Sequence, residues 1–170
     1  MNASQLENGG IMTFRKIRRI KNEIPIEAAK ELLKNNRRAA LSVNGDHGYP
    51  YTVPINFYYE EEENRIYFHS AKAGHKIDSI RSSDKVCLTT WDDGYLDDGD
   101  WAYRVSCCVV FGRARLMEDR ALTEEKVRKL ALKYYPTAEA VEEEIKADIH
   151  AVQLVAIEIE HISGKKVHEK

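Results

Sequence analysis

The sequence predicts a mainly β domain, in which peripheral helices surround a closed or nearly closed barrel of antiparallel strands. Runs rich in β-branched and aromatic residues follow one another in the first half of the chain, and clusters of turn-forming residues separate them. A last strand follows two helical stretches and has to return to the sheet. The length of 170 residues suits one domain with a single core, so we expect one functional site.

The first half of the chain is expected to begin with a short amphipathic helix. Pro25 lies at a favourable helix start, and apolar residues recur at helical spacing until Asn35 and Asn36 end the pattern. Pro54 interrupts the second of the three strands that follow, so this position should be an edge, a bulge or a place where something else approaches. The strands are expected at residues 39–43, 51–59 and 65–70, with turns at 44–48 and 60–64 and a second helix at 74–83.

The second half is expected to contain two strands, two helices and the returning strand. In the longer strand, Gly112 and the small Ala114 permit a bulge or a sharp bend of the kind found at barrel corners. Glu124 and Glu125 favour the N-terminus of the first helix electrostatically, and Pro136 stops that helix. The strands are expected at residues 86–91, 103–117 and 152–162, and the helices at 123–135 and 138–149.

Composition excludes several classes of partner and chemistry. The formal net charge is −2, so no overall field draws the chain to nucleic acid or to an anionic membrane. The longest apolar stretches are far short of the ~20 residues that a membrane span requires. Cys87, Cys107 and Cys108 show neither a disulfide framework nor zinc-ligand spacing, and no local motif indicates a hydrolase. No metal is expected.

The N-terminal segment is set apart from the domain. Residues 1–11 are polar and rich in glycine toward their end, and Met12 would serve equally well as a start, so we expect a flexible leader before a domain at 12–170. The first ten residues lack the basic start and the apolar core of a secretory signal. A cytoplasmic location is therefore expected.

The most informative segment runs from Phe68 to Lys76, out of a strand and into a helix. A helix N-terminus presents unpaired N–H groups and a partial positive charge, and Gly74 lets the backbone approach a ligand closely. The alternative is a solvated basic turn that caps the strand. The side chains here that can donate to phosphate oxygens are Ser70, Lys72, His75 and Lys76.

Further candidate residues lie on either side of this segment. His69 alternates with Phe68 and faces the other side of the sheet, either as a packing residue or as a donor to a bound ring or substrate. Asn56 offers a donor and an acceptor to the edge of a heteroaromatic ring, or else it bonds to its own backbone. Aromatic residues that flank an acidic loop are candidates for a lid or a dimer contact: Trp91, Tyr95, Trp101 and Tyr103.

Six segments together form a fairly specific set. They are Leu41-Ser42, Gly48–Phe57, Ile66–Ala71, Gly74–Lys76, Phe111–Ala114 and Ile162–Lys166. In this set the chain resembles the flavoproteins related to pyridoxamine 5′-phosphate oxidase, and in particular the branch related to nitroimidazole resistance proteins. The resemblance covers residues 24–165.

The resemblance implies a split β-barrel that forms a homodimer and holds FMN in a cleft at the subunit interface. The FMN phosphate would lie near Ser70, His75 and Lys76. His69 would lie near the flavin as the catalytic residue, for substrate contact or proton donation. The full set of cofactor-binding residues that the resemblance implies is Val53, Pro54, Ile55, Asn56, His69, Ser70, Ala71, Gly74, His75, Lys76, Ser106 and Cys107.

The chain departs from its relatives at two places. Relatives place Ser and then Val five residues before the glycine that matches Gly112; here Cys107 takes that place and Ser106 precedes it, so either side chain is a candidate to face the cofactor. The chain also lacks the Arg-Leu-x-Pro ending of authentic pyridoxamine phosphate oxidases and stops at Lys170. Pyridoxamine phosphate is therefore not expected to be the substrate.

Three functions remain open at this point. The first is an FMN-dependent oxidoreductase that passes electrons from a nicotinamide nucleotide to a small acceptor such as a nitroaromatic compound. The second is a non-catalytic protein that binds flavin or haem, with His69, His75 or His161 as a haem ligand. The third is a structural dimer with an empty cleft. Turnover of a nicotinamide nucleotide separates the first from the others.

Overall fold

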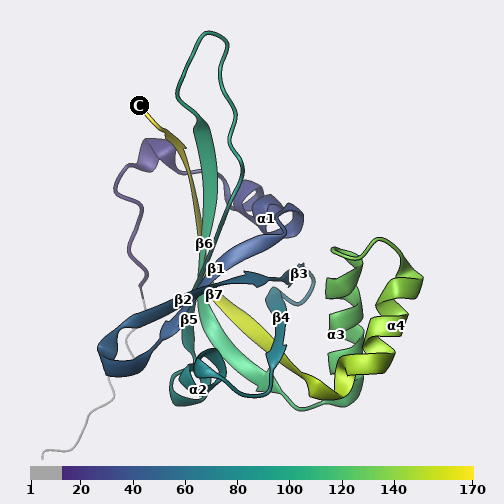
Figure 1. The fold of residues 1–170 in the computed structure, drawn as a ribbon. Coiled ribbons are helices and arrows are strands. Elements are labelled where there is room, and N and C mark those ends of the chain that lie inside the picture. Colours follow the sequence, from purple (N-terminus) through teal and green to yellow (C-terminus); the bar gives the residue numbers. More distant parts are fainter. Residues whose placement is uncertain (1–12) are drawn as a thin grey trace, which may run out of the picture.

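Seven antiparallel strands form one curled sheet in the computed structural model, which describes residues 13–170 (Figure 1). Their order across the sheet is β2-β1-β5-β6-β7-β4-β3. The predicted leader at residues 1–11 lies outside the described residues. The strands are β1 (Arg38–Asn44), β2 (Pro50–Asn56), β3 (Tyr58–Glu60), β4 (Arg65–Ala71), β5 (Lys85–Trp91), β6 (Arg104–Met117) and β7 (Val152–His168).

In the described part of the chain, four α-helices lie around this half-barrel, as Figure 1 shows. They are α1 (Ile26–Asn35), α2 (His75–Ser82), α3 (Arg120–Leu132) and α4 (Ala138–Asp148). Three 3-10 turns are also present: η1 (Ile20–Asn22), η2 (Asp46–Gly48) and η3 (Ile149–Ala151). The mainly β fold predicted from the sequence, a split barrel with flanking helices, is confirmed. None of the helices in the described residues is long and apolar enough to cross a membrane.

At Phe57 the chain passes from one edge of the sheet to the other. β2 pairs with β1 and β3 pairs with β4, so the two outermost strands of the sheet are consecutive in the sequence and meet at this residue. The prediction of one strand over residues 51–59 is therefore wrong, because the backbone changes partner where the Phe57 side chain enters the core, with 0% exposure. Within residues 13–170 the second edge of β2 is unpaired, which confirms the edge position predicted for Pro54.

Alternate residues of β4 face two different hydrophobic cores. Ile66 and Phe68 point into the barrel, whereas Tyr67 faces outward and is buried in a second core under α3 and α4. His69 is the next outward-facing residue after Tyr67, and Ser70 follows Phe68 on the inner face. The side chains of His69 and Ser70 therefore lie on opposite faces of the sheet.

β6 and β7 form the longest ladder, and a β-bulge bends it. The register between the two strands shifts between Phe111 and Gly112, as the sequence predicts at this glycine. A Cβ atom on Gly112 would lie 2.4 Å from the backbone oxygen of Glu158, so only glycine fits this close approach. The last strand runs on to His168, beyond the predicted end at residue 162, because β6 pairs with it along its whole length.

α3 begins earlier than predicted and is fixed by a buried lysine. Asp119 is its N-cap and accepts a hydrogen bond from the Leu122 N–H at 3.0 Å, so the helix starts at Arg120 and not at residue 123. Lys126, with 2% of its side chain exposed, lies 3.2 Å from Oε2 of Glu60 and also contacts the Glu63 carboxylate. This network holds α3 against the β3–β4 hairpin.

Candidate functional site

Three hollows on the outside of the barrel meet at Asn56, the last residue of β2. The basic hollow, of about 360 Å³, is lined by Arg38, Pro54, Ile55, Asn56, His69 and Lys76. The helix-pair pocket, of about 300 Å³, lies between the sheet and the α3–α4 pair and shares Asn56 and His69 with the basic hollow. The β1–β2 groove, of about 950 Å³, runs along β1 and β2 toward Trp91. Because each shares lining residues with the other two, they adjoin one another, and together we call them the site.

The basic hollow has the electrostatics of an anion site. Its lining includes the cations Arg38 and Lys76 and no carboxylate, and neither cation forms an ion pair within 4 Å in the described part of the chain. The Lys76 ammonium lies 5.4 Å from the centroid of the Phe68 ring, and burial lowers the pKa of Lys76. Because its charge is only partly hydrated and has no carboxylate partner, an incoming anion would be stabilised here.

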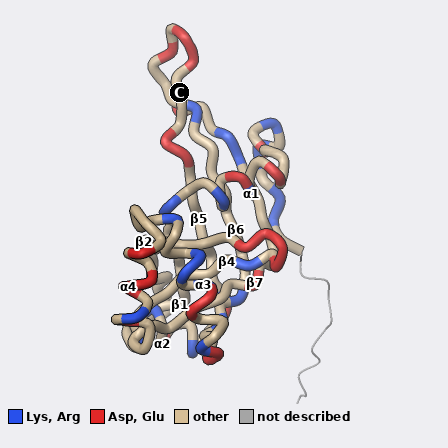
Figure 2. The backbone as a smooth tube through the Cα atoms, turned by 90° about the vertical axis from the view of Figure 1, so that its right-hand side faces the viewer, with Lys and Arg blue, Asp and Glu red and all other residues tan. Residues whose placement is uncertain are grey.

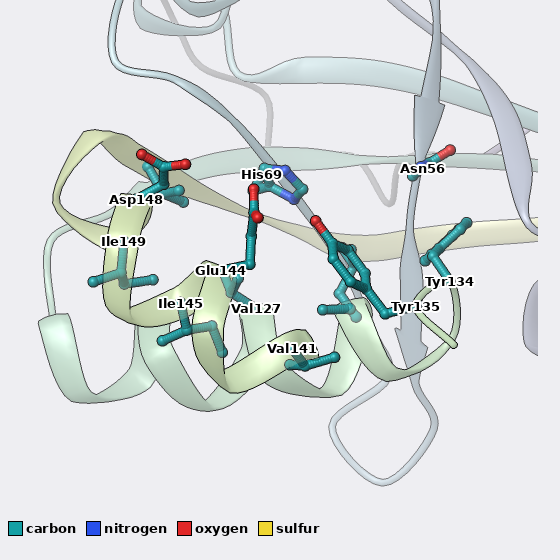
Figure 3. A pocket seen from close by; sticks show the side chains of 13 residues that line it. Asn56, His69, Val127, Tyr134, Tyr135, Val141, Glu144, Ile145, Asp148 and Ile149 are labelled. Carbon is teal, nitrogen blue, oxygen red and sulfur yellow. The ribbon is translucent and has the colours of Figure 1, made fainter. Parts of the chain in front are cut away.

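His69 lies where the basic hollow joins the helix-pair pocket. Figure 3 shows its ring directed into the pocket, with the Glu144 carboxylate pointing toward it from α4. Burial, and secondly the charge of Lys76, lower the pKa of His69. The ring is therefore neutral near pH 7, and one nitrogen can donate a hydrogen bond while the other accepts one.

The other predicted phosphate residues lie around the start of α2 but do not line the basic hollow. Gly74 is the N-cap of α2 and has φ of 124°, which glycine adopts readily. The His75 ring stacks on Tyr51 with 4.0 Å between centroids, and its Nε2 lies 3.6 Å from Oδ2 of Asp46. Ser70 is half-buried on the inner face of β4, and Ala71 ends that strand, exposed.

The remaining predicted cofactor residues divide between β2 and β6. Pro54, Ile55 and Asn56 line the basic hollow, while Val53 lines the β1–β2 groove beside them. Ser106 is buried, and its N–H donates to Oδ1 of Asp92 at 2.8 Å. Cys107 is half-buried on the opposite face of β6, and neither residue lines any of the three hollows. Within one chain, the structure does not bring them to the site.

Residues that the sequence analysis missed complete the walls of the site. Arg38 begins β1, and its proximity to Lys76 could not be read without the strand order. Tyr134 receives a hydrogen bond on its hydroxyl from the Phe57 N–H, at 3.0 Å, and donates to the Arg37 carbonyl. The one sequence feature that could have pointed to this part of the wall is the pair of tyrosines directly before Pro136. The acidic and aromatic residues contributed by the helix pair are Tyr134, Tyr135, Glu144 and Asp148.

Two of the three candidate haem ligands have their rings stacked on aromatic neighbours. His161 stacks on Phe14 with 4.6 Å between centroids, and His75 stacks on Tyr51. Among the described residues, only His69 of these three lines the hollows. In the same part of the chain, no group of three or more His, Cys, Asp or Glu side chains is arranged to hold a metal ion.

Comparison with known proteins identifies the family. The family model described as pyridoxamine 5′-phosphate oxidase matches residues 25–166. The chain belongs to this family. No curated protein matches the chain.

Solved structures show the same fold at low sequence identity. A candidate 5-nitroimidazole antibiotic resistance protein from Bacteroides thetaiotaomicron is 20% identical, with a TM-score of 0.71 and coverage of 86% of this chain and 87% of that one. An FAD-binding protein from Mesorhizobium loti is 21% identical, with a TM-score of 0.61 and coverage of 85% and 96%. Flavocytochrome Anf3 from Azotobacter vinelandii is 22% identical, with a TM-score of 0.69 and coverage of 88% and 71%. These similarities support the split-barrel fold.

Proposed function

We propose that the protein is a cytoplasmic homodimer that binds FMN and transfers electrons from a nicotinamide nucleotide to a small acceptor. The observation that carries the proposal is the basic hollow, where Arg38 and Lys76 face a shared space without a carboxylate. A phosphate group fits such a site, because charge-assisted hydrogen bonds from cationic side chains are the strong ones. The names of the Mesorhizobium loti protein, an FAD-binding protein, and of the Azotobacter vinelandii flavocytochrome support a flavin as the ligand.

The residues of the site suggest how FMN would be held. Lys76 would bind the phosphate, with Gly74 and His75 at the start of α2 and Ser70 near the end of β4. The unpaired edge of β2 presents backbone N–H and C=O groups beside Pro54 and Asn56, and these groups would bind the edge of the isoalloxazine ring. When bound, FMN would supply the hydride and electron chemistry, and the chain would orient it and exclude water.

His69 is the residue best placed to act on a substrate. Its neutral ring lies between the space proposed for the flavin and the helix-pair pocket, and it would donate a hydrogen bond or a proton to a bound acceptor. A nitroaromatic acceptor agrees with the structural similarity to the candidate 5-nitroimidazole resistance protein.

A second copy of the chain would complete the cofactor site. The strands β5 and β6 carry an arm whose loop holds five aspartates, drawn red in Figure 2, between exposed aromatic residues. Trp101 is 76% exposed and Trp91 is 54% exposed, an unusual amount of free aromatic surface for a monomer. In the proposed dimer this arm lies against the other subunit, and Ser106 or Cys107 of the partner subunit reaches the flavin. A mass of twice 19.5 kDa by light scattering, reduced in Trp91→Ser, would support this arrangement.

The central experiment is a titration of the flavin-free protein with FMN, followed by absorbance and flavin fluorescence. Lys76→Met should raise the dissociation constant by about 10- to 100-fold, because a hydrogen bond to a charged group contributes about 1.5–3 kcal/mol. Lys72→Met removes the same charge four residues earlier, outside the hollow, and should change it by less than about threefold. Equal losses in both variants, or no flavin binding by the wild type, would contradict the proposal.

Turnover then distinguishes catalysis from storage. The FMN-loaded protein should oxidise a nicotinamide nucleotide, in the presence of a nitroaromatic acceptor, faster than the same concentration of free FMN. A retained flavin spectrum without turnover would favour a non-catalytic flavin protein. A Soret band in the purified protein would instead favour haem.

A further inference from the structure

The helix-pair pocket differs from the basic hollow in its lining. Seven of its 13 lining residues have aliphatic side chains: Val127, Leu130, Ala131, Val141, Ile145, Ile149 and Val152. Its volume of about 300 Å³ lies at the lower end of the range for ligand pockets, roughly 300–1,000 Å³, so it suits a small single-ring molecule. No Lys or Arg side chain of the described residues lines it.

Two carboxylates stand at the rim of this pocket. Glu144 and Asp148 lie one turn apart on α4, and Figure 3 shows both carboxylates on the side of the helix that faces His69. Neither forms an ion pair within 4 Å in the part of the chain that the structure describes, unlike Glu142 on the same helix, which binds Arg128. Burial, and then the charge of Glu144, raise the pKa of Tyr135, so its phenol stays protonated beside them.

The site therefore has ends of opposite charge. The basic hollow carries Arg38 and Lys76, the pocket carries Glu144 and Asp148, and His69 with Asn56 lies at the junction. An anion is attracted to the first end and repelled from the second. A molecule that is mainly apolar fits the pocket wall, and an ammonium or another hydrogen-bond-donating cation on it would be stabilised by the rim.

We propose that the helix-pair pocket is the substrate end of the site, and that it selects small aromatic molecules bearing a cationic amine over anionic or phosphorylated ones. This inference rests on the proposed function, because it treats the basic hollow as the cofactor end. The apolar wall holds the ring, the carboxylates of Glu144 and Asp148 bind the amine, and His69 contacts the group that faces the flavin. The pocket thereby rejects a second phosphate beside that of the cofactor.

Three isosteric nitroaromatic compounds test the selection: para-nitrobenzylamine, para-nitrobenzyl alcohol and para-nitrobenzoate. With the FMN-loaded dimer we expect kcat/KM to fall in this order, by at least about tenfold from the amine to the carboxylate. In the double variant Glu144→Gln/Asp148→Asn, the preference should collapse to within about threefold, through KM and not kcat, while the FMN dissociation constant is unchanged. A preference that survives in this variant, or a wild type that prefers the carboxylate, would overturn the inference.

A matched control separates local charge from net charge. Glu139→Gln/Glu143→Gln removes two carboxylates from the same helix, outside the pocket lining, and should keep the wild-type preference. If both double variants lost the preference for the amine equally, a local role of Glu144 and Asp148 would be overturned. Binding of para-nitrobenzylamine to the flavin-free protein, measured by calorimetry, gives a readout without turnover. Amine binding without flavin binding would support the proposed role of the pocket and refute the proposed function. Flavin binding without amine preference would support the proposed function and refute the role of the pocket.

Discussion

The imidazole of His75 lies flat against the ring of Tyr51, with 4.0 Å between the ring centroids and an interplanar angle of 22°. The contact joins the first residue of α2 to the strand β2, and Asp46 in the β1–β2 turn lies beside the same imidazole. The start of α2 is thus held against the strand that borders the basic hollow. His75 has a positioning role in this structure, in addition to its proposed place near the phosphate.

We predict that His75→Ala weakens FMN binding less than Lys76→Met does. Loss of the stacked ring frees the start of α2, which should raise the FMN dissociation constant by about three- to tenfold, since aromatic pairs contribute about 0.5–1.5 kcal/mol. The same variant should unfold at a lower urea concentration. Tyr51→Leu removes the other ring and serves as the control, because it should reproduce both effects without touching a phosphate ligand. A much larger effect of His75→Ala than of Tyr51→Leu would mean that His75 binds the phosphate directly.

The titration of His69 should respond to Lys76. Burial and the Lys76 charge both disfavour the imidazolium, so the pKa of His69 lies below the ordinary value of about 6.5. We expect Lys76→Met to raise it, as followed by NMR of the imidazole carbon-bound protons, whereas Lys72→Met leaves it unchanged. The folded state binds this proton less well than the unfolded chain, so His69 lowers stability only as pH falls below about 6.5. An unchanged His69 titration in Lys76→Met would contradict the proximity of the two groups.

If His69 has a catalytic role, its replacement should lower turnover and leave FMN binding nearly unchanged. His69→Asn keeps a polar side chain in place, so the FMN dissociation constant should change by less than about threefold. Turnover with a nitroaromatic acceptor should fall by about 10²- to 10⁴-fold if proton donation is its role, which is the usual contribution of a general acid. Steady-state kinetics and flavin titration on the same preparation check both expectations. Full activity in His69→Asn would leave His69 as a packing residue.

The buried ion network of α3 predicts a pH-dependent loss of stability. Lys126→Met should lower the free energy of unfolding by about 3 kcal/mol at pH 7, because it leaves Glu60 and Glu63 without their buried cation. Desolvation opposes ionisation of Glu60, but the lysine hydrogen bonds outweigh it and the pKa of Glu60 is lowered; Lys126 above all lowers that of Glu63. Depressed carboxyl pKa values stabilise the fold above about pH 4.5, and this contribution is lost as pH falls through the lowered values.

Urea unfolding at pH 7 and pH 3.5 measures this difference. The gap between the wild type and Lys126→Met should shrink at the lower pH, as the carboxyls begin to protonate. Lys129→Met, which removes a more exposed partner of Glu60, is the control and should cost less than about 1 kcal/mol. A gap that does not depend on pH would assign the effect to packing of the lysine stem.

The bulge in the β6–β7 ladder gives a steric prediction. Gly112→Ala places a methyl group 2.4 Å from the Glu158 backbone oxygen, so the ladder has to shift, and we expect a loss of about 1–3 kcal/mol in the free energy of unfolding. Thermal unfolding followed by circular dichroism measures it. Val109→Ala, on a half-buried position of the same strand, should cost less. A fully stable Gly112→Ala protein would show that the bulge relaxes without cost.

Much of the fold could be read from the sequence, since local patterns determine it. The strands β1, β4 and β5 were predicted to within one residue at each end, and the bulge was predicted from Gly112. The break at Phe57 was missed because an aromatic residue is favourable in a strand. Only the curling of the whole sheet determines that the residues before Phe57 pair with β1 and those after it with β4. Asp119 was overlooked as the N-cap of α3 because the helix was expected to begin at Thr123, four residues later.

The candidate site was predictable only where its residues are close in the sequence. His69 and Lys76 come from one segment, and the structure does place both at the basic hollow. Arg38 and Glu144 reach the site through the strand order and the packing of α4, which no local pattern records. Ser106 and Cys107 could not be assigned, because their proposed contact requires a second chain and so depends on the interface and not on the fold of one subunit.

The two ends of the site come from different segments of the chain. Everything at the basic end belongs to residues 38–76, and nearly everything at the other end belongs to residues 127–152. A hydrogen bond from Phe57 to Tyr134, the Lys126 network and the second core around Tyr67 join these segments. Because the residues that line the pocket are concentrated in the helix pair, we expect that replacing residues 119–151 by those of a relative changes the ligand preference and leaves the cofactor end unaltered, so that new specificities can arise without rebuilding the barrel.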